Sequence, residues 1–354
     1  GTFTNPVRID ADSLSTDSSE SLSGQFLYAV GVVGIDSLDA GSVIVTLSGD
    51  EFRLNDPDSI SDDTVVSVFS SSAVLNLNGS DETIHGLQGP GEVRLDRSTL
   101  TIDTEEVTAF DGVLSGSGNL TKRGSGGLIL NGASTYTGLT IIEDGTLFAT
   151  VSQSLGAGGT EASGTDVREA AQLGILNSIE TSETLAVAGL LNLSVGSAAV
   201  TLAAGSLSLE SGSALLMSVY SSEVGDFDQI VVTGRVEIDD TILVLALSQF
   251  TPGDSDRVVL IDNDGTDPIE GEFRAFPNGT VLNINGALRS VSYFAGDGND
   301  FGLLPIEQNV LVEVDQFGNL HITDVAAGGS RNALFVTHDL DTDEFVVTSL
   351  RPEL

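Results

Sequence analysis

Short apolar strands recur along this chain at a nearly constant spacing, and this rhythm limits the folds open to it. Between residues 186 and 217 most units point two apolar side chains one way and a small polar one the other, with Gly or Ser between units. The units are Leu191-Asn192-Leu193, Val200-Thr201-Leu202, Leu207-Ser208-Leu209 and Leu215-Leu216-Met217, about eight residues apart. Such a strand cannot bury its apolar face alone, but stacked copies form a continuous core. The pattern therefore predicts a β-solenoid.

The rest of the chain also favours an all-β fold. Alternation of apolar and polar residues continues through residues 43–47, 64–69 and 99–103. Helical periodicity appears only in residues 165–179, where Gly174 interrupts the apolar face. A sandwich of many short strands has similar signals. The 41 glycines favour the solenoid, because its sharp corners need a positive φ or a close approach of backbones. We expect a right-handed β-helix.

The pattern divides the chain into three parts. We expect an N-terminal cap and first strands in residues 1–40, the solenoid body in residues 41–306, and a small C-terminal β unit in residues 307–354. In this tail, two pairs of β-rich segments flank polar loops of four or five residues, which is typical of β-hairpins. The paired segments are residues 310–314 with 319–323, and residues 333–337 with 344–349.

Charge excludes several classes of function. The chain has 52 acidic and 13 basic residues, a formal net charge of −39, and Lys122 is its only lysine. Nucleic acid is therefore not expected as a partner, because phosphate binding needs clustered Lys and Arg. The chain has no cysteine for disulfides or thiolate metal sites, and no apolar run long enough for a transmembrane helix. Self-repulsion at this charge favours surroundings rich in cations, although acidity can also serve only solubility.

Residues 116–147 fill the pattern GSGxLTKxGxGxLxLxGxxxYxGxTxxxxGTL almost throughout. The stretch begins Gly116-Ser117-Gly118-Asn119-Leu120-Thr121-Lys122-Arg123-Gly124, continues through Tyr136-Thr137-Gly138, and ends Gly145-Thr146-Leu147. It resembles the autotransporter-associated β-strand repeat of bacterial passenger domains. Leu139 departs from the family, which more often has Gly or Thr at that position. Weaker copies flank the repeat, and segments within residues 226–300 resemble the ends of such repeats in large secreted proteins of planctomycete-like bacteria.

The resemblance implies a right-handed β-helical stalk, extracellular or at the bacterial cell surface, that serves adhesion, matrix or display. It implies no chemistry. The first functional hypothesis is therefore a rod-like stalk, fibre subunit or surface-layer component, able to self-associate or to contact surface and matrix components. An adhesin that recognises glycan or protein is the second.

A β-helical enzyme that degrades polysaccharides is the third hypothesis. Right-handed β-helices carry such enzymes, and paired carboxylates can cleave glycans. Among 52 acidic residues, however, close pairs arise by chance, and four Tyr with no Trp offer few platforms for sugars. The three histidines, His85, His321 and His338, lack the sequence context of a hydrolase triad. We expect no enzymatic activity.

Calcium is the one cofactor that the residues suggest. Three acidic turns alternate oxygen ligands around small residues, a spacing that suits calcium. The candidate ligands are Asp262, Asp264 and Asp267 in the first turn, Asp297, Asn299 and Asp300 in the second, and Asp339, Asp341 and Asp343 in the third. The second turn resembles one copy of a glycine-rich calcium nonapeptide. Ordinary turn chemistry of Asp, Asn and Gly is the alternative for each.

The repeat predicts which side chains face the core. Leucines at its alternating positions should point inward, and Thr121 should lie on the outer face. The inward residues are Leu120, Leu128, Leu130 and Leu147, with Gly124, Gly132 and Gly145 at corners where a Cβ would clash.

The tail is the expected assembly element. Its β segments lack the repeat pattern, and a solenoid ends in strand edges that can pair with another chain. Because the chain is so acidic, we expect tail contacts of this kind to depend on divalent cations near Asp339, Asp341 and Asp343.

Overall fold

Buried and partly exposed side chains alternate along most of the strands. In β25 (Ser206–Leu209), Leu207 and Leu209 are buried while Ser206 and Ser208 are partly exposed. Neighbouring strands pair in parallel and in register, so equivalent side chains stack on one another. The chain therefore winds as a β-solenoid, and the described residues contain no helix. This confirms the all-β solenoid fold.

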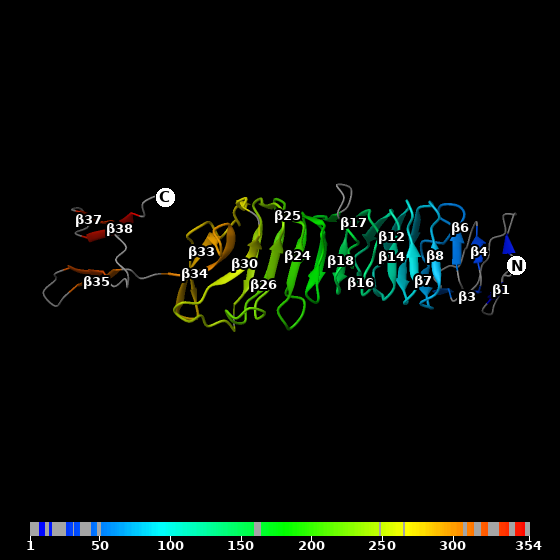
Figure 1. Cartoon of the computed structure of the whole chain (residues 1–354), viewed down its shortest axis with the longest axis horizontal. Coiled ribbons are helices and arrows are strands. Elements are labelled where there is room, and N and C mark those ends of the chain that lie inside the picture. The colour runs from blue at the N-terminus through cyan, green and yellow to red at the C-terminus, as the bar shows by residue number, and fades with distance from the viewer. Residues whose placement is uncertain are drawn as a thin grey trace. The chain divides into compact units, whose positions relative to one another are not determined.

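The structure is a computed structural model. It describes residues 51–158, 164–247, 249–264 and 266–306 in full, and only the backbone of the strands on either side of that range. The chain divides into two units, Gly1–Leu304 and Pro305–Leu354. The first unit is the solenoid, whose strands follow one another in chain order in Figure 1.

Five sheets form the faces of the solenoid. The nine-stranded sheet contains β9 (Glu82–Ile84), β12 (Thr99–Asp103), β15 (Asn119–Arg123), β17 (Leu139–Ile142), β19 (Gly164–Val167), β22 (Thr184–Val187), β25, β28 (Val236–Ile238) and β31 (Glu270–Gly271). The β13–β29 sheet contains β13 (Val107–Phe110), β16 (Gly127–Leu130), β18 (Gly145–Ala149), β20 (Ala171–Ile175), β23 (Leu190–Asn192), β26 (Ala214–Ser218) and β29 (Ile242–Ala246).

The other three sheets lie toward the two ends of this unit in sequence. The β21–β32 sheet contains β21 (Ile179–Glu180), β24 (Thr201–Ala204), β27 (Gln229–Val232), β30 (Val258–Asn263), β34 (Asp300–Pro305), β33 (Ala287–Ala295) and β32 (Val281–Ile284). The β1–β10 sheet contains β1 (Val7–Asp10), β3 (Phe26–Val30), β5 (Ile44–Leu47), β7 (Val65–Val68) and β10 (Gly86–Gln88). The β2–β14 sheet contains β2 (Leu14–Ser15), β4 (Val32–Ile35), β6 (Glu51–Leu54), β8 (Val74–Asn76), β11 (Glu92–Arg94) and β14 (Val113–Ser115).

Throughout the parallel turns, from β1 to β31, consecutive strands belong to different sheets, and pairing joins strands one turn apart. Leu100 pairs with Leu120, and Leu120 with Thr140, each 20 residues further along the chain. The strands β23 to β26 coincide with the regularly spaced units of the sequence and pass in turn through three sheets. Residues 165–179, the one stretch with helical periodicity, lie in β19, β20 and the start of β21. Cross-strand pairing therefore overrides that periodicity.

The repeat packs its leucines as the sequence predicts. The side chains of Leu120, Leu128, Leu130 and Leu147 are at most 1% exposed. Thr121 alternates with them and lies on the outer side, but it is only 6% exposed because it stacks between Thr101 and Ile141 of the neighbouring strands. The outer face of this sheet is thus more closely packed than the sequence indicated.

Glycines hold the corners of the repeat. A Cβ on Gly132 would lie 1.7 Å from the carbonyl oxygen of Gly112, and one on Gly112 would lie 1.8 Å from that of Gly91. These three glycines therefore stack at one corner, where successive turns approach too closely for any side chain. Gly145 has a φ of +68°, which also favours glycine.

Antiparallel strands cover the core after the last parallel turns. β30 pairs with β34 and β32 pairs with β33, both antiparallel. Phe273, Tyr293 and Phe301 form an aromatic cluster there, and the ring centroid of Phe301 lies 4.9 Å from those of the other two. All three side chains are buried, so this segment shields the apolar ladders from solvent.

The second unit contains two hairpins, as the sequence predicts. β35 (Val310–Val314) pairs antiparallel with β36 (Leu320–Asp324), and β37 (Ala333–Asp339) pairs antiparallel with β38 (Glu344–Leu350).

Replacing Leu130 with alanine should lower the free energy of unfolding by about 2 to 5 kcal/mol, because it leaves a cavity in a close-packed core. Leu139→Ala is the matched control, since Leu139 belongs to the same repeat but is 38% exposed, and we expect a loss below about 1 kcal/mol. Urea unfolding followed by circular dichroism measures both. Equal losses at the two positions would contradict the assignment of the core.

Candidate functional site

Two of the three acidic turns lie together at the antiparallel end of the solenoid. Asp300, which begins β34, accepts a hydrogen bond on Oδ1 from the backbone N–H of Asn263 at 2.8 Å. Its Oδ2 accepts one from the backbone N–H of Asp297 at 3.2 Å. The carboxylate thus ties the turn after β30 to the turn before β34, which are more than 30 residues apart in sequence.

Asparagine side chains complete this connection. Nδ2 of Asn299 donates to the carbonyl oxygens of Asn263, at 2.9 Å, and Asp267, at 3.2 Å. Nδ2 of Asn263 also donates to the Asp267 carbonyl, at 2.7 Å. The Asn263 side chain is completely buried, and its Oδ1 has no hydrogen-bond partner among the described atoms. Buried acceptors without a partner are uncommon in folded proteins.

Repulsion between carboxylates is concentrated at the same place. Burial raises the pKa of Asp262, and the charges of Asp297 and Asp264 raise it further. Burial also raises the pKa of Asp300, against its two backbone hydrogen bonds and with the charges of Asp262 and Asp297. Nowhere in the described part of the chain do three or more His, Asp or Glu side chains converge as metal ligands do. Calcium binding therefore stays a prediction.

The third group of predicted calcium ligands lies in the second unit. Asp339 is the last residue of β37, and its side chain, together with Asp341 and Asp343, lies outside the described residues.

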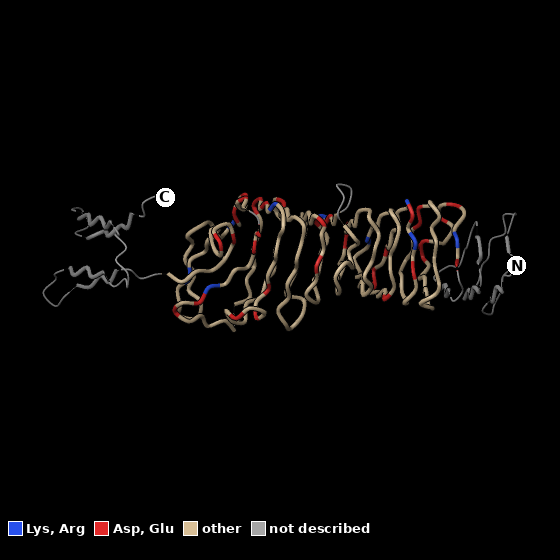
Figure 2. The backbone as a smooth tube through the Cα atoms, in the orientation of Figure 1, with Lys and Arg blue, Asp and Glu red and all other residues tan. Residues whose placement is uncertain are grey.

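The sequence did not predict a second cluster of acidic residues. A shallow groove of about 620 Å³ lies beside the nine-stranded sheet. Its acidic lining comes from four different turns and consists of Glu169, Glu210, Glu237, Asp239 and Glu270. In Figure 2 acidic residues gather along the margin of the solenoid near β25. Arg235 pairs with both Glu237, at 2.6 Å, and Glu270, at 2.5 Å.

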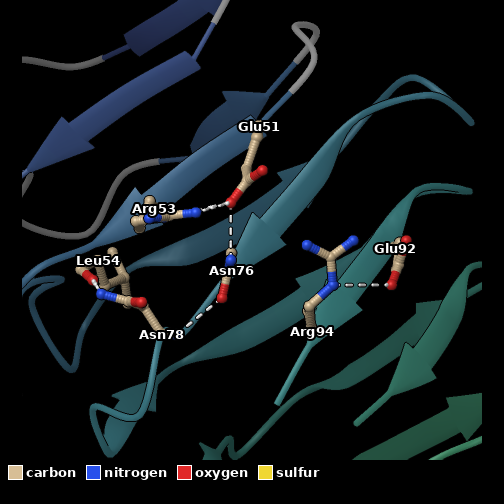
Figure 3. A network of polar contacts seen from close by, with 7 residues as sticks. All are labelled: Glu51, Arg53, Leu54, Asn76, Asn78, Glu92 and Arg94. Atoms are coloured by element: carbon tan, nitrogen blue, oxygen red, sulfur yellow. Dashed lines mark hydrogen bonds and ion pairs between the residues drawn. The ribbon is translucent and has the colours of Figure 1, made fainter. Parts of the chain in front are cut away.

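A polar network crosses the outer face of the β2–β14 sheet (Figure 3). Nδ2 of Asn76 donates to Glu51 at 2.7 Å, and Glu51 also pairs with Arg53 at 3.0 Å. On the next strand Arg94 pairs with Glu92 at 3.4 Å. The hydrogen bond from Asn76 is the largest cause that lowers the pKa of Glu51, followed by the interactions with Arg53. The hydrogen bond from Asn76 to Glu51 links two successive turns, whereas the two ion pairs lie within single strands.

Comparison with known proteins agrees with this architecture. Residues 120–147 match the family model of the Passenger-associated-transport-repeat. These residues run from β15 to β18 and make up more than one turn of the solenoid.

An autotransporter protein also matches. The chain is 38% identical over 85 residues to the Adhesin BmaC autotransporter of Brucella suis biovar 1 (strain 1330). The match covers 22% of this chain and 2% of the adhesin. A solenoid that contains a passenger repeat fits a passenger-domain-like protein. None of the described segments is a helix of the length and apolarity needed to cross a membrane.

Within the passenger repeat, the only lysine is buried. Lys122 occupies an inward position between Ile102 and Ile142 and is fully covered. Its Nζ donates to the carbonyl oxygens of Arg123, at 2.6 Å, and Gly124, at 2.7 Å. Burial lowers the pKa of Lys122 to about 8. The lysine of the motif therefore ties a corner together from inside the core, a role that its sequence context alone did not reveal.

Glu183 is a second buried ionisable group that the sequence did not reveal. The residue is 1% exposed. Its Oε2 accepts a hydrogen bond from Oγ1 of Thr165 at 3.1 Å, and its Oε1 has no partner among the described atoms. The backbone at Gly158 covers it, since a Cβ there would lie 2.7 Å from Cγ of Glu183. Burial raises the pKa of Glu183 to about 7.

Glu82, on β9 at one end of the nine-stranded sheet, behaves in the same way. Its carboxylate accepts backbone hydrogen bonds from Ser59, at 2.9 Å, and Ile60, at 3.1 Å. Burial nevertheless raises its pKa to about 8. Both glutamates are therefore largely protonated in mildly acidic solution.

The free energy of unfolding should fall as the pH rises. For Glu183 the folded-state pKa of about 7 lies above the ordinary value of 4.5, so the folded chain holds a proton that the unfolded chain releases. This contribution is present below pH 4.5 and is lost as the pH rises through 7; for Glu82 the loss extends to about 8. Each unit of pKa shift corresponds to at most about 1.4 kcal/mol.

Glu183→Gln tests this assignment. The neutral amide should reduce the loss of stability between about pH 5 and pH 8, measured by urea unfolding at each pH. Glu180→Gln is the matched control, because Glu180 is exposed and its replacement should leave the pH profile unchanged. An unaltered profile in Glu183→Gln would mean that Glu183 is not protonated in the fold.

Proposed function

We propose that this chain is a rod-like stalk segment of a secreted or cell-surface protein of the autotransporter passenger type. The observation that carries the proposal is the unbroken stack of parallel turns, in which backbone hydrogen bonds and inward leucines continue from one turn to the next. Such a stack gains length with every turn at constant cross-section. The passenger repeat and the match to an autotransporter adhesin support the location and an adhesion-related role.

The described residues favour a mechanical role over catalysis. In the acidic turns Asp300 and Asn299 serve the fold: both oxygens of Asp300 accept backbone hydrogen bonds, and Asn299 donates to two carbonyl groups. The buried Glu82 and Glu183 lie inside the solenoid rather than in a cleft. We therefore propose no enzymatic activity.

An adhesin role is the second candidate, and the acidic groove favours it. The groove collects carboxylates from several turns on one concave surface, where Arg235 neutralises only part of the charge. A cationic protein segment is the partner that this chemistry suits.

The stalk role predicts a distance. Placed between a membrane anchor and a fluorescent tag, the chain should hold the tag about 50 Å further from the membrane than the anchor alone, because its stacked turns rise about 4.8 Å each. Energy transfer from the tag to a membrane dye measures this. If the folded insert does not separate tag from membrane, the stalk role is wrong.

We also propose that a divalent cation binds beside Asp262 and Asp297. The support is their mutual repulsion and the unpartnered Oδ1 of Asn263, which together offer hard oxygen ligands of the kind calcium takes. Without divalent cations, Asp297→Asn should raise the free energy of unfolding by a few tenths of a kcal/mol, up to about 1, since it removes a like charge that water partly screens.

Calcium should reverse the order of stability of the unaltered chain and Asp297→Asn. At millimolar calcium the melting temperature of the unaltered chain should rise more than that of Asp297→Asn, because a bound ion stabilises the folded state. Magnesium at the same ionic strength controls for screening. Equal shifts in the two proteins would contradict the site.

A further inference from the structure

The outward face of the β13–β29 sheet carries no charged residue. Its side chains form two rows along the solenoid, one from Val107 on β13 to Ile242 on β29, the other from Ala109 to Val244. Neither row contains Asp, Glu, Lys or Arg on any of the seven strands. We call these two rows the apolar flank. In a chain with a net charge of −39, a face of this length without charge needs a physical explanation.

Large apolar side chains are exposed on this flank. Val107 is 67% exposed, Val244 47% and Ile242 42%. Ile129 and Leu190, between them along the rows, are partly exposed. The flank is therefore an uncharged surface with exposed apolar side chains on its first and last strands. Thr146, Gln172 and Asn192 add the only polar side chains between them.

The flank is also flattened around its largest side chain. A Cβ on Gly174 would lie 2.7 Å from Cδ1 of Phe148, and one on Gly127 would lie 3.4 Å from Cε2 of the same ring. The ring of Phe148 therefore lies down across the sheet, in space that the two glycines leave free. A flat apolar sheet face is the kind of surface that packs against another sheet.

Two other faces of the described solenoid carry charge. On the nine-stranded sheet, Asp166, Glu237 and Glu270 occupy one outward row. On the β2–β14 sheet, Glu51 and Arg53 point outward in the network of Figure 3. Any contact through these faces brings carboxylates of an acidic chain together, whereas a contact through the apolar flank brings none.

We propose that the apolar flank is a lateral docking face for a second copy of this chain. A second copy offers the same uncharged surface, so that flank packs on flank, as two sheets do at about 10 Å, with the acidic faces turned away. The contact is side by side and differs from assembly through the tail. It does not depend on the stalk role.

The size of the flank sets the strength of the contact. Seven strands about 4.8 Å apart make it about 29 Å long, and two rows of side chains make it about 15 Å wide, so each copy buries roughly 400 Å². Stable interfaces bury about 1,200 to 2,000 Å² in total, and smaller ones are weak and transient. Association is therefore weak in solution and grows where copies are concentrated side by side on one surface.

Sedimentation of the full 354-residue chain over a range from micromolar to several hundred micromolar tests the proposal. We expect a reversible monomer–dimer equilibrium that strengthens when sodium chloride is raised, because salt screens repulsion between acidic copies, and that a chelator leaves unchanged. Leu190→Glu, in the middle of the flank, should weaken the dimer at least about tenfold by burying an unpaired carboxylate.

Leu139→Glu is the matched control, because it makes the same replacement on the outer face of the nine-stranded sheet, and it should change dimerisation less than about twofold. Circular dichroism and the melting temperature establish that both variants fold. A chain that stays monomeric throughout the range overturns the proposal, as does equal weakening by the two variants. So does a monomeric chain whose flank binds lipid vesicles instead, with Leu190→Glu abolishing that binding.

A single cysteine gives a geometric test, since the chain has none of its own. Gln172 lies on β20, the central strand of the seven. A twofold arrangement of two flanks brings the two Gln172 positions to about the 10 Å spacing of packed sheets, so a short bis-maleimide should crosslink Gln172→Cys into a dimer, whereas a direct disulfide would need Cα atoms within about 7 Å. Leu139→Cys should remain monomeric under the same conditions. Equal crosslinking of both variants would exclude this face.

Discussion

Parallel stacking of one turn on the next is the interaction on which the rest of this structure depends. Each strand hydrogen-bonds to strands of the preceding and following turns, and the side chains of equivalent positions form ladders such as Leu185, Leu207 and Val236. Because no disulfide is available, these local ladders supply the stability that a globular core obtains from long-range packing. The aromatic cluster of Phe273, Tyr293 and Phe301 then covers the last turns.

The distribution of charge follows from this stacking. An inward position is repeated in every turn, so an ionisable residue there is buried whether or not a partner exists. Lys122 and Glu82 form hydrogen bonds with backbone groups at corners. Glu183 accepts a hydrogen bond from Thr165, and its raised pKa favours the neutral, protonated form. Most acidic residues in the described part of the chain lie instead on turns and outer faces, where water screens them. The β13–β29 sheet departs from this arrangement, with an outer face free of charge.

Much of the fold could be predicted from the sequence because its information is local. The inward leucines of residues 120–147, the corner glycines and both tail hairpins follow from strand periodicity and turn chemistry within a few residues. The candidate site could be predicted only in part. The sequence indicated two separate acidic turns. The hydrogen bonds of Asp300 that join them form only because β34 pairs antiparallel with β30. The burial of Glu183 depends on which residue of the next turn lies beside Thr165. This register could not be predicted from the sequence, because the turns differ in length.

The stacked glycines at positions 91, 112 and 132 have an evolutionary consequence. A turn that carries such a glycine has no side chain at the corner where turns approach closely. A duplicated copy of that turn can therefore be inserted next to the original without a clash. Duplication or loss of whole turns then changes the chain in increments of about 4.8 Å. Gene rearrangement can in this way adjust the reach of such a protein while every existing turn keeps its neighbours and its sequence.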